Sequence, residues 1–450
     1  MSSECGENQH MNIGIFGINV GNRNLGDEAT FEVMLEAIRQ KCCEAGVYAI
    51  CSDPDDTAQR YLLPAFPIGN RKKVKEQVVG AVMEGTSVQG MSIQERLSNA
   101  IMARIKRRRF LFVPLKIVYT MLSGVVNGPF EFAREFWFSV RAITFIRKID
   151  LVVIAGSGVL SDHSGGTWNF PYSVFKWSVL SKLAGAKIAF VSVGAGPINS
   201  VRSKYLLKYA LSLAEYRSFR DEDSRRLIES IGVKGNNRVF PDLVQGLKIN
   251  NDQNTGNKIV GCVVGINPFP HYWYANDPEA YSRYVRKTAL FVSWLVENRY
   301  RVVFFPTHLR ADYKVINDIR EIMSKQLQQN CEADPFERPI HGIGDLLCQI
   351  SVMDLVVATR FHGIVLSFLM NKPVIGISNQ PKMDSLMRDM GQGDYLLDLE
   401  RFDVETLRER FLSLEANRDK IKRDVQPIIS GYREALETQY REVFKLVNVP

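Results

Sequence analysis

Short, wholly apolar runs recur along this chain, each followed by small or polar residues and then by a helix-like pattern. Leu151–Ala155 and Leu355–Ala358 are the clearest, because neither contains a polar residue. Strands buried on both faces have this composition, and they occur in parallel sheets covered by helices. The alternation therefore predicts a doubly wound α/β fold. The predicted strands are Met11–Gly17, Val47–Cys51, Leu151–Ala155, Lys187–Val193, Tyr216–Phe219 and Arg238–Phe240, then Ile259–Ile266, Arg301–Phe305, Leu355–Ala358 and Val374–Ile377.

The strands fall into two series, which predicts two Rossmann-like domains that face a cleft. A polar, turn-forming run at 250–257 separates the series. We therefore expect a first domain over residues 11–249 and a second over 258–400. Residues 401–450 are predicted to be a charged helical segment that packs back on the first domain. A break in that segment is expected near Pro427 and Gly431.

Residues 69–148 interrupt the first series. They carry the basic clusters 71–73 and 106–109 and several aromatic residues, and we interpret them as a basic helical insertion. Alternating basic and apolar residues could bind an anionic membrane surface. An additional helical subdomain with solvated charges explains the same pattern, so both interpretations stay open.

Composition limits the classes of partner. The 450 residues carry 57 Lys and Arg against 49 Asp and Glu, a net charge of +8 that suits anionic partners. No nucleic-acid-binding motif occurs, so no nucleic acid is expected. The seven cysteines form no CxxC pair, which is typical of reduced thiols in a cytosolic protein. A polar N-terminus and the lack of a long uncharged apolar run predict neither a secretory signal nor a membrane span, hence a cytoplasmic protein.

Arg360-Phe361-His362 is the clearest candidate site. It directly follows the strand at 355–358, and Gly363 opens the next helix. Ligands bind at the carboxyl ends of strands in open α/β sheets, and helix N-termini attract anions. An arginine there can bind a phosphate or carboxylate, and a histidine can move a proton near neutral pH. Lys382, which follows the next strand, adds a third group suited to a small, highly charged anion.

Other strand ends carry further candidates. Arg220 precedes an acidic helix start that Asp221 caps, so it either pairs with those carboxylates or points into the cleft as a second anion clamp. His308 faces the cleft if its strand is assigned correctly, although a lone histidine is more often structural. No histidine spacing indicates a metal site.

Small residues at strand ends leave space for a ligand. Gly26 and Asp27 follow the first strand, and Asp27 is predicted to cap a helix from about Glu28 to Glu44, with a ligand contact as the alternative. Asp162 could orient or deprotonate a hydroxyl, or be solvated in its loop. The cleft-facing glycines we expect are Gly26, Gly156, Gly158 and Gly194.

Taken together, these segments resemble the polysaccharide pyruvyl transferase family. The matching segments, in the family's order, are 24–29, 156–162, 193–197, 219–224 with Asp242, 360–362, and 376–378 with Lys382. They cover most of the chain except 69–148. The resemblance implies two Rossmann-like domains of the GT-B type. It also implies transfer of pyruvate from phosphoenolpyruvate to two sugar hydroxyls, with formation of a ketal and release of phosphate.

The resemblance assigns roles to the candidate residues. His362 would transfer a proton, and Asp162 or Asp27 would activate or hold the acceptor. No metal or other cofactor is required. The residues implied to bind phosphoenolpyruvate are Arg220, Arg360, Phe361, Gly363 and Lys382. The sequence departs from the family at Phe361, where leucine is usual, and at Ser157, where glycine is usual.

Alternatives stay open at this stage. A glycosyltransferase of the same fold would use a nucleotide sugar, with ribose held by a carboxylate such as Asp384. A non-catalytic relative would keep the cleft and use the basic insertion as a membrane anchor. The acceptor, a glycan or a lipid-linked sugar, is not identified. The oligomeric state also stays open, a homo-oligomer included.

Overall fold

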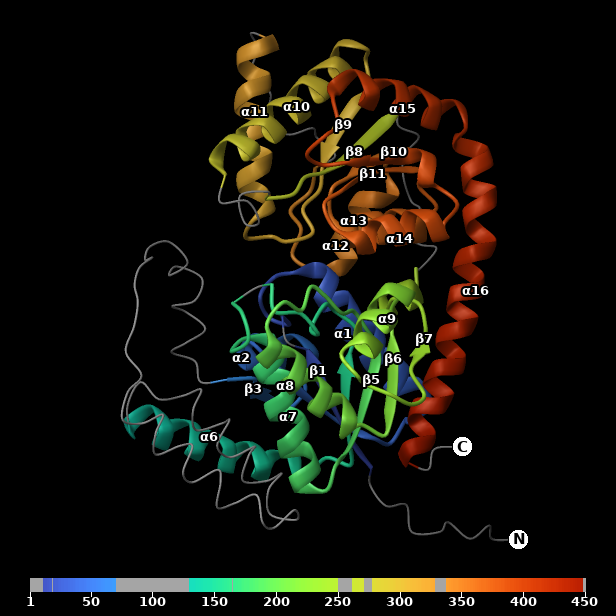
Figure 1. The fold of residues 1–450 in the computed structure, drawn as a ribbon. Coiled ribbons are helices and arrows are strands. Elements are labelled where there is room, and N and C mark those ends of the chain that lie inside the picture. Colours follow the sequence, from blue (N-terminus) through green and yellow to red (C-terminus); the bar gives the residue numbers. More distant parts are fainter. Residues whose placement is uncertain are drawn as a thin grey trace, which may run out of the picture.

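The computed structural model describes residues 11–17, 19–69, 129–163, 165–249, 261–270, 277–327 and 337–447. Two parallel sheets, each enclosed by helices, form two lobes (Figure 1). The predicted α/β fold with two Rossmann-like domains is confirmed. The predicted boundary run at 250–257 and residues 70–128 of the predicted insertion lie outside the described residues.

The first sheet has seven parallel strands. Its order is β3-β2-β1-β4-β5-β6-β7, so the chain reverses direction across the sheet between β1 and β4. Residues of β4 alternate between two cores: Leu151, Val153 and Ala155 face one, and Val152 and Ile154 face the other. The strands are β1 (Asn12–Gly17), β2 (Gly46–Cys51), β3 (Ala65–Pro67), β4 (Leu151–Ala155), β5 (Lys187–Val193), β6 (Tyr216–Phe219) and β7 (Arg238–Val239).

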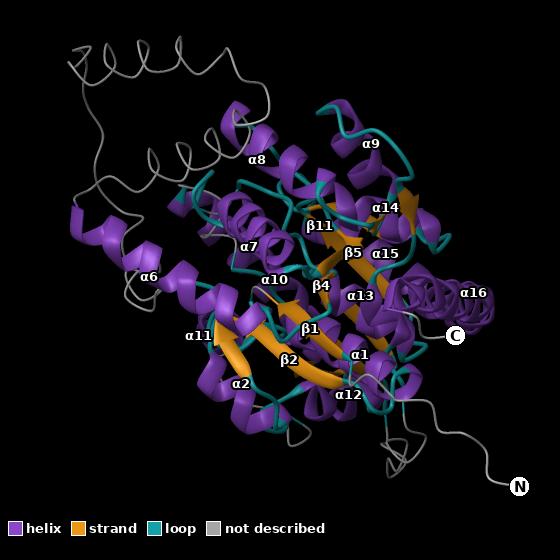
Figure 2. Cartoon of the chain, turned by 90° about the horizontal axis from the view of Figure 1, so that it is seen from below, coloured by secondary structure: helices purple, strands orange, loops and turns teal. Residues whose placement is uncertain are grey.

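Helices cover both faces of this sheet. Helix α1 packs in the core that includes Ile13 and Ile15, and α7 packs in the opposite core around Trp177 (Figure 2). The helices are α1 (Leu25–Lys41), α2 (Pro54–Tyr61), α6 (Pro129–Ile146), α7 (Phe170–Ala184), α8 (Val201–Ser212) and α9 (Glu222–Ser230), with a 3₁₀ turn η1 (Leu243–Gly246). Asp221 caps α9 by accepting from the backbone N–H of Ser224, as predicted.

The second sheet has five parallel strands in the order β12-β11-β10-β8-β9. The strands are β8 (Val263–Asn267), β9 (Arg301–Phe304), β10 (Leu355–Ala358), β11 (Val374–Ser378) and β12 (Leu396–Asp398). The helices are α10 (Pro278–Glu297), α11 (Asp312–Leu327), α12 (Ile343–Ser351), α13 (Phe361–Leu369), α14 (Pro381–Asp389) and α15 (Val404–Ala416). A 3₁₀ turn, η4 (Gly393–Tyr395), leads into β12.

The predicted helix break near Pro427 and Gly431 is wrong. The break lies at Asn417, and α16 (Arg418–Phe444) continues through both residues before the 3₁₀ turn η5 (Lys445–Val447). Buried residues such as Ile421, Val425 and Ile429 anchor α16 on both sides of the proline, so packing outweighs the hydrogen bond that proline removes. The helix leaves the second domain and runs along the first (Figure 1).

Of the predicted insertion, the structure describes residue 69 and residues 129–148. Most of the latter form α6, which buries Phe138 and exposes Phe136 and Trp137. Among the described residues, no helix is long and apolar enough to cross a membrane. Binding of a membrane surface by residues 69–148 stays a prediction.

Candidate active site

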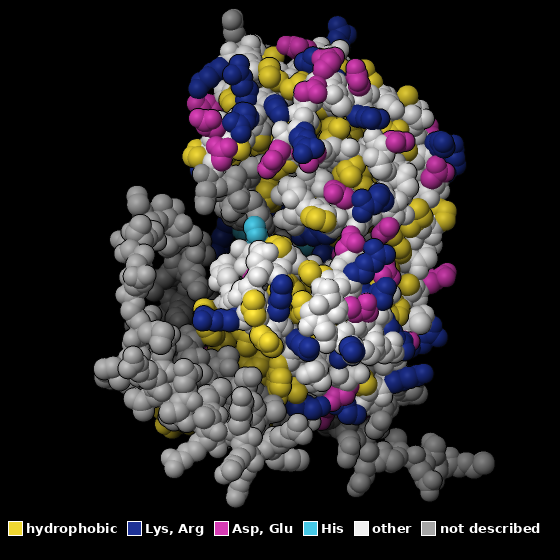
Figure 3. Space-filling model, viewed as in Figure 1, with side chains coloured by type: hydrophobic (Ala, Val, Ile, Leu, Met, Phe, Trp, Pro, Cys, Tyr) yellow, Lys and Arg dark blue, Asp and Glu magenta, His cyan; other side chains and the backbone are white. Residues whose placement is uncertain are grey.

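A cavity of about 310 Å³ lies where the carboxyl ends of strands from both sheets meet. The first sheet contributes the loops after β1, β4, β5 and β6, and the second contributes the loops after β8, β9, β10 and β11. The cavity is lined by Asn19, Asn22, Asn24, Asp27, Ser157, Gly158, Ser161, His163, Phe170, Gly196, Arg220, Phe269, Thr307, His308, Thr359, Arg360, Phe361, His362, Asn379, Gln380, Lys382 and Met383. Figure 3 shows histidine and basic side chains at the hollow between the two lobes.

Arg360 is held rigidly at the start of α13. It occupies the N-cap position, and its guanidinium forms an ion pair with the fully buried Asp312. Asp312 also accepts hydrogen bonds of 2.9 Å from the backbone N–H groups of Thr307 and His308. The guanidinium carbon lies 5.0 Å from the centroid of the Phe269 ring. A planar cation fixed in this way can present its remaining donors to a phosphate or carboxylate.

Arg220 reaches the same cavity from the first domain. Its Nε lies 3.2 Å from Asp221 and its Nη1 lies 3.4 Å from Asp242, so it pairs with carboxylates and also lines the cavity. Its guanidinium lies 4.7 Å from the centroid of the Phe361 ring. A side chain at position 194 would overlap this guanidinium, so only glycine leaves room for Arg220 there. Arg220 therefore pairs with the carboxylates and also points into the cavity, and its role as an anion clamp stays a prediction.

Lys382 is the third cation. It lies in the first turn of α14, with its ammonium 5.3 Å from the Phe361 ring centroid. The pKa of Lys382 is lowered to about 8, first by burial and then by the positive charge of Arg220, while Asp27 and Asp242 oppose the shift. A cation from each domain therefore lies over the Phe361 ring. A leucine at this position has no aromatic face and could not make these cation–π contacts.

His362 lies between the two domains. Its Nδ1 edge packs against Gly26 of α1, where any side chain would overlap the imidazole. Its Nε2 is buried and has no hydrogen-bond partner among the described residues. Burial lowers the pKa of His362, with Lys382 and Arg220 adding to the effect and Asp242 and Asp27 opposing it. The neutral imidazole therefore predominates at neutral pH in this state.

Asp27 lines the cavity, but the predicted cap is wrong. Helix α1 begins at Leu25, with Asn24 at the N-cap position, so Asp27 lies in the first turn. Its Oδ2 accepts hydrogen bonds from the side-chain amides of Asn19 (2.8 Å) and Asn24 (2.7 Å). The carboxylate of Asp27 therefore binds these side-chain amides in place of backbone N–H groups of the helix, and it faces the cavity.

His308 also lines the cavity, at a contact between the domains. The backbone N–H of Leu25 donates to Thr307 (2.8 Å), and that of Leu309 donates to Arg23 (3.0 Å), so the loops after β1 and β9 pair across the interface. Burial, and then the charge of Arg360, lower the pKa of His308. The predicted orientation toward the cleft agrees with this position.

Five predicted residues are not part of the cavity lining: Gly26, Gly156, Asp162, Gly194 and Gly363. Both oxygens of Asp162 accept from the backbone N–H groups of Asn199 and Ser200, and these bonds lower the pKa of Asp162 although burial opposes them. These bonds give Asp162 a role in holding the start of α8, and its predicted role with the acceptor stays a prediction. Gly156 packs against Thr30, and Gly363 packs against Asn267. Gly158, by contrast, lines the cavity.

Several cavity residues were not predicted as site residues. Phe269 and the amides of Asn19 and Asn22 come from loops whose sequences show only turn-forming character. Asp221 was predicted beside Arg220, but two further partners of the arginines were missed: Asp242 beside Arg220, and Asp312 beside Arg360. The spacing of His308 and Asp312, one helical turn apart, was the only local signal that this loop is organised by a carboxylate.

Comparisons with known proteins agree with this architecture. The family model described as polysaccharide pyruvyl transferase matches residues 24–381. A search of the curated proteins found no significant match.

Solved structures share the fold at low sequence identity. MnaA from S. aureus in its UDP co-structure is 10% identical, with a TM-score of 0.54 over 98% of this chain and 98% of that chain. A glycosyltransferase from Rickettsia africae is 11% identical, with a TM-score of 0.53 over 97% and 99%. The UDP-GlcNAc 2-epimerase from Methanocaldococcus jannaschii is 11% identical, with a TM-score of 0.51 over 89% and 92%. At these identities the likeness concerns the fold alone.

Proposed function

The chain belongs to the polysaccharide pyruvyl transferase family, and we propose that it transfers the pyruvyl group of phosphoenolpyruvate to two hydroxyls of one sugar. The sugar is part of a glycan or of a lipid-linked precursor. The products are a pyruvate ketal and inorganic phosphate. The observation that carries the proposal is the convergence of Arg220, Arg360 and Lys382 with His362 on one cavity of about 310 Å³.

The charges of the cavity suit phosphoenolpyruvate. This donor carries a phosphate and a carboxylate on three carbons, so a site for it needs several cations close together. Arg220 and Arg360 come from opposite domains and Lys382 from the start of α14, where backbone N–H groups also favour anions. The buried carboxylates beside the arginines fix their geometry before the donor binds, which lowers the entropy cost of binding.

The reaction balances without an external oxidant or reductant. Two C–O bonds form between C2 of the pyruvyl group and the two sugar oxygens, and the bond between C2 and the phosphate oxygen breaks. One hydroxyl proton ends on C3, which becomes a methyl group, and the other leaves with the phosphate. We assign His362 to the transfer of the proton between hydroxyl and carbon, because its neutral imidazole can accept a proton. We assign Asp27, whose carboxylate is held by two amides, to orienting the acceptor.

A nucleotide-sugar glycosyltransferase is the competing function. The solved structures above include a glycosyltransferase and a UDP-GlcNAc 2-epimerase, but at 10–11% identity they support the fold and not the donor. A non-catalytic relative is the other alternative. Three cations that share a buried cavity with a histidine are costly to retain in a protein that binds no anion there, which favours the enzyme.

Thermal shift with phosphoenolpyruvate tests the donor. A ligand that binds only the folded state raises the melting temperature by mass action, so wild type should show a concentration-dependent shift. Arg360→Ala should lose most of that shift, because the variant lacks the fixed guanidinium at α13. Arg360→Lys keeps the charge next to the buried Asp312 and should retain part of it. Phosphate release in the presence of a mixed glycan pool then reports turnover.

The exposed Arg410, on α15, provides a matched control, and Arg410→Ala should shift as wild type does. Each variant is compared with its own unliganded melting temperature, because removal of Arg360 leaves a buried carboxylate unpaired. If saturating phosphoenolpyruvate leaves wild type unchanged while a UDP-sugar shifts it, the glycosyltransferase alternative replaces our proposal.

A further inference from the structure

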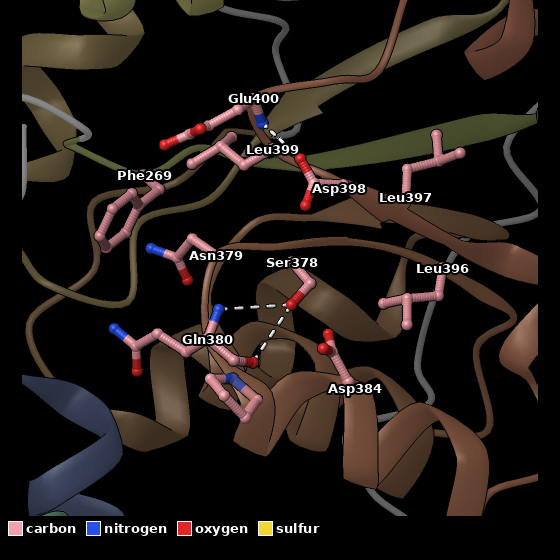
Figure 4. Close-up of a pocket in the computed structure, with 11 residues that line it drawn as sticks. Phe269, Ser378, Asn379, Gln380, Asp384, Leu396, Leu397, Asp398, Leu399 and Glu400 are labelled. Carbon is pink, nitrogen blue, oxygen red and sulfur yellow. Dashed lines mark hydrogen bonds between the residues drawn. The ribbon is translucent and has the colours of Figure 1, made fainter. Parts of the chain in front are cut away.

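A second cavity, of about 540 Å³, lies in the second domain (Figure 4). It is formed by the loop after β11, the first turn of α14 and the loop after β12, with Phe269 at one side. These loops lie at the carboxyl ends of the strands, where open α/β sheets bind ligands. Nothing in the proposed reaction so far uses this space.

The two cavities adjoin. Phe269, Asn379 and Gln380 line both of them, so one molecule can extend from the first into the second. Hydrogen bonds between Ser378 and Gln380, of 3.2 and 3.3 Å, fix the loop that separates them. The stacking of Arg360 on Phe269 fixes the other side of the boundary.

The charges of the two cavities are opposite. Arg220, Arg360 and Lys382 line the first, whereas Asp384, Asp398 and Glu400 line the second, and no Lys or Arg among the described residues lines it. Carboxylates in a partly enclosed space repel phosphate and attract hydroxyl donors. An anionic donor and a neutral, hydroxyl-bearing ligand are thereby directed to neighbouring places.

The polar groups of the second cavity suit a sugar ring. Asp398 accepts from the backbone N–H groups of Glu400 and Arg401, both at 3.0 Å, and so shapes the loop after β12. Neither the carboxylate of Asp384 nor the side-chain amide of Asn379 forms a hydrogen bond with the other lining residues drawn in Figure 4. A carboxylate and an amide can bind neighbouring hydroxyls together, while Leu396 and Leu399 offer apolar surface to the ring.

We infer that this second cavity is the acceptor subsite: it binds a neutral pyranose ring through Asp384 and Asn379. The ring's hydroxyls then lie at the boundary formed by Phe269, Asn379 and Gln380, next to the donor cavity. This inference rests on the proposed function for the identity of the second substrate. It also explains the opposite charges of the two cavities, because the carboxylates of the acceptor subsite repel a second molecule of the anionic donor.

Ligand-observed NMR tests the subsite directly. Saturation-transfer signals are measured for methyl β-D-galactopyranoside, methyl β-D-glucopyranoside and methyl α-D-mannopyranoside, and separately for uridine, each without donor. At least one glycoside should bind wild type. Asp384→Asn should weaken that binding about 10- to 100-fold, the usual effect of losing a hydrogen bond to a charged group. The thermal shift with phosphoenolpyruvate should stay unchanged in the same variant.

Asp394→Asn is the matched control, because Asp394 is exposed on η4 and lines neither cavity. It should bind glycosides as wild type does. Undiminished glycoside binding by Asp384→Asn, or no binding of any of the three glycosides to wild type, overturns the inference. Binding of uridine alone, dependent on Asp384, also overturns it and identifies a nucleoside site. If phosphoenolpyruvate does not raise the melting temperature of wild type, the proposed function fails, whatever the glycoside measurements show.

Discussion

At the scale of single residues, His362 is the most direct test of the chemistry. His362→Gln should lower kcat by about 10²- to 10⁴-fold, as is typical when a general acid or base is removed. The thermal shift with phosphoenolpyruvate should persist, because the three cations remain. His341→Gln, an exposed histidine on the loop before α12, should keep wild-type activity. A kcat for His362→Gln within threefold of wild type would remove this residue from the mechanism.

The pH dependence follows from the same cluster. Burial lowers the pKa of His362, so the acid limb of kcat/KM should lie below pH 6.5 and should be absent in the glutamine variant. Lys382 loses its charge as pH rises through about 8, so donor binding should weaken there and produce a basic limb. In Lys382→Arg, which stays charged, the basic limb should move upward. An unchanged basic limb in that variant would show that another group titrates.

Lys382 also links function to stability. Its pKa falls from 10.5 to about 8 on folding, which corresponds to about 3 kcal/mol of destabilisation by the buried charge below pH 8. Lys382→Met should therefore raise the free energy of unfolding near pH 7. Because wild type gains stability as pH rises from about 8 to 10.5, the advantage of the variant should disappear over that range. Denaturant titrations at pH 7 and 10.5 measure it; equal differences at both values would contradict the explanation.

At the scale of elements, buried strands were the most predictable feature. Leu151–Ala155, Lys187–Val193, Tyr216–Phe219 and Leu355–Ala358 begin and end where their sequences predict. For Leu151–Ala155 and Leu355–Ala358 the reason is a continuous apolar run, which central parallel strands favour. The short edge strands β3 and β12 were missed, since three residues cannot show a pattern.

Helix starts were less predictable than central strands. Both Asn24 and Asp27 are good cap residues, and the sequence alone does not show that the carboxylate of Asp27 is bound by amides instead. The backbone bonding of Asp162 was hidden for the same reason, because its partners Asn199 and Ser200 are distant in the sequence. Local sequence therefore shows that a side chain can cap a helix or accept hydrogen bonds, but not which of several possible partners it binds.

The first turn of α1 gives a prediction at this scale. Glycine to alanine usually stabilises a helix by about 1 kcal/mol, but a methyl group at Gly26 would overlap the His362 imidazole. Gly26→Ala should therefore displace His362 and reduce kcat strongly without unfolding the protein. Gly431→Ala, in an open position of α16, should stabilise the protein and leave activity unchanged. If Gly26→Ala kept wild-type kcat, the contact between α1 and His362 would have no catalytic importance.

At the scale of the whole molecule, the site exists only because two domains are held together. Arg220 and Asp27 belong to one lobe, and Arg360, His362 and Lys382 belong to the other. The fold class and these five residues could be predicted, since strand ends in both halves must face a common cleft. The contacts that close the cleft could not, because pairs such as Leu25 with Thr307, or Ser385 with Asp223, depend on the relative placement of the domains.

Helix α16 connects the second domain back to the first. The buried side chain of Gln439 fixes this helix to the first domain. Its side-chain amide donates to the hydroxyls of Ser192 (3.0 Å) and Ser218 (2.7 Å), inside the first domain. Gln439→Ala should cost about 2–4 kcal/mol, because two buried hydroxyls lose a partner. Since the first domain alone loses that contact, calorimetry should show one unfolding transition dividing into two. The exposed neighbour variant Thr438→Ala should change stability by less than about 0.5 kcal/mol. A single, unshifted transition in Gln439→Ala would mean that α16 does not couple the domains.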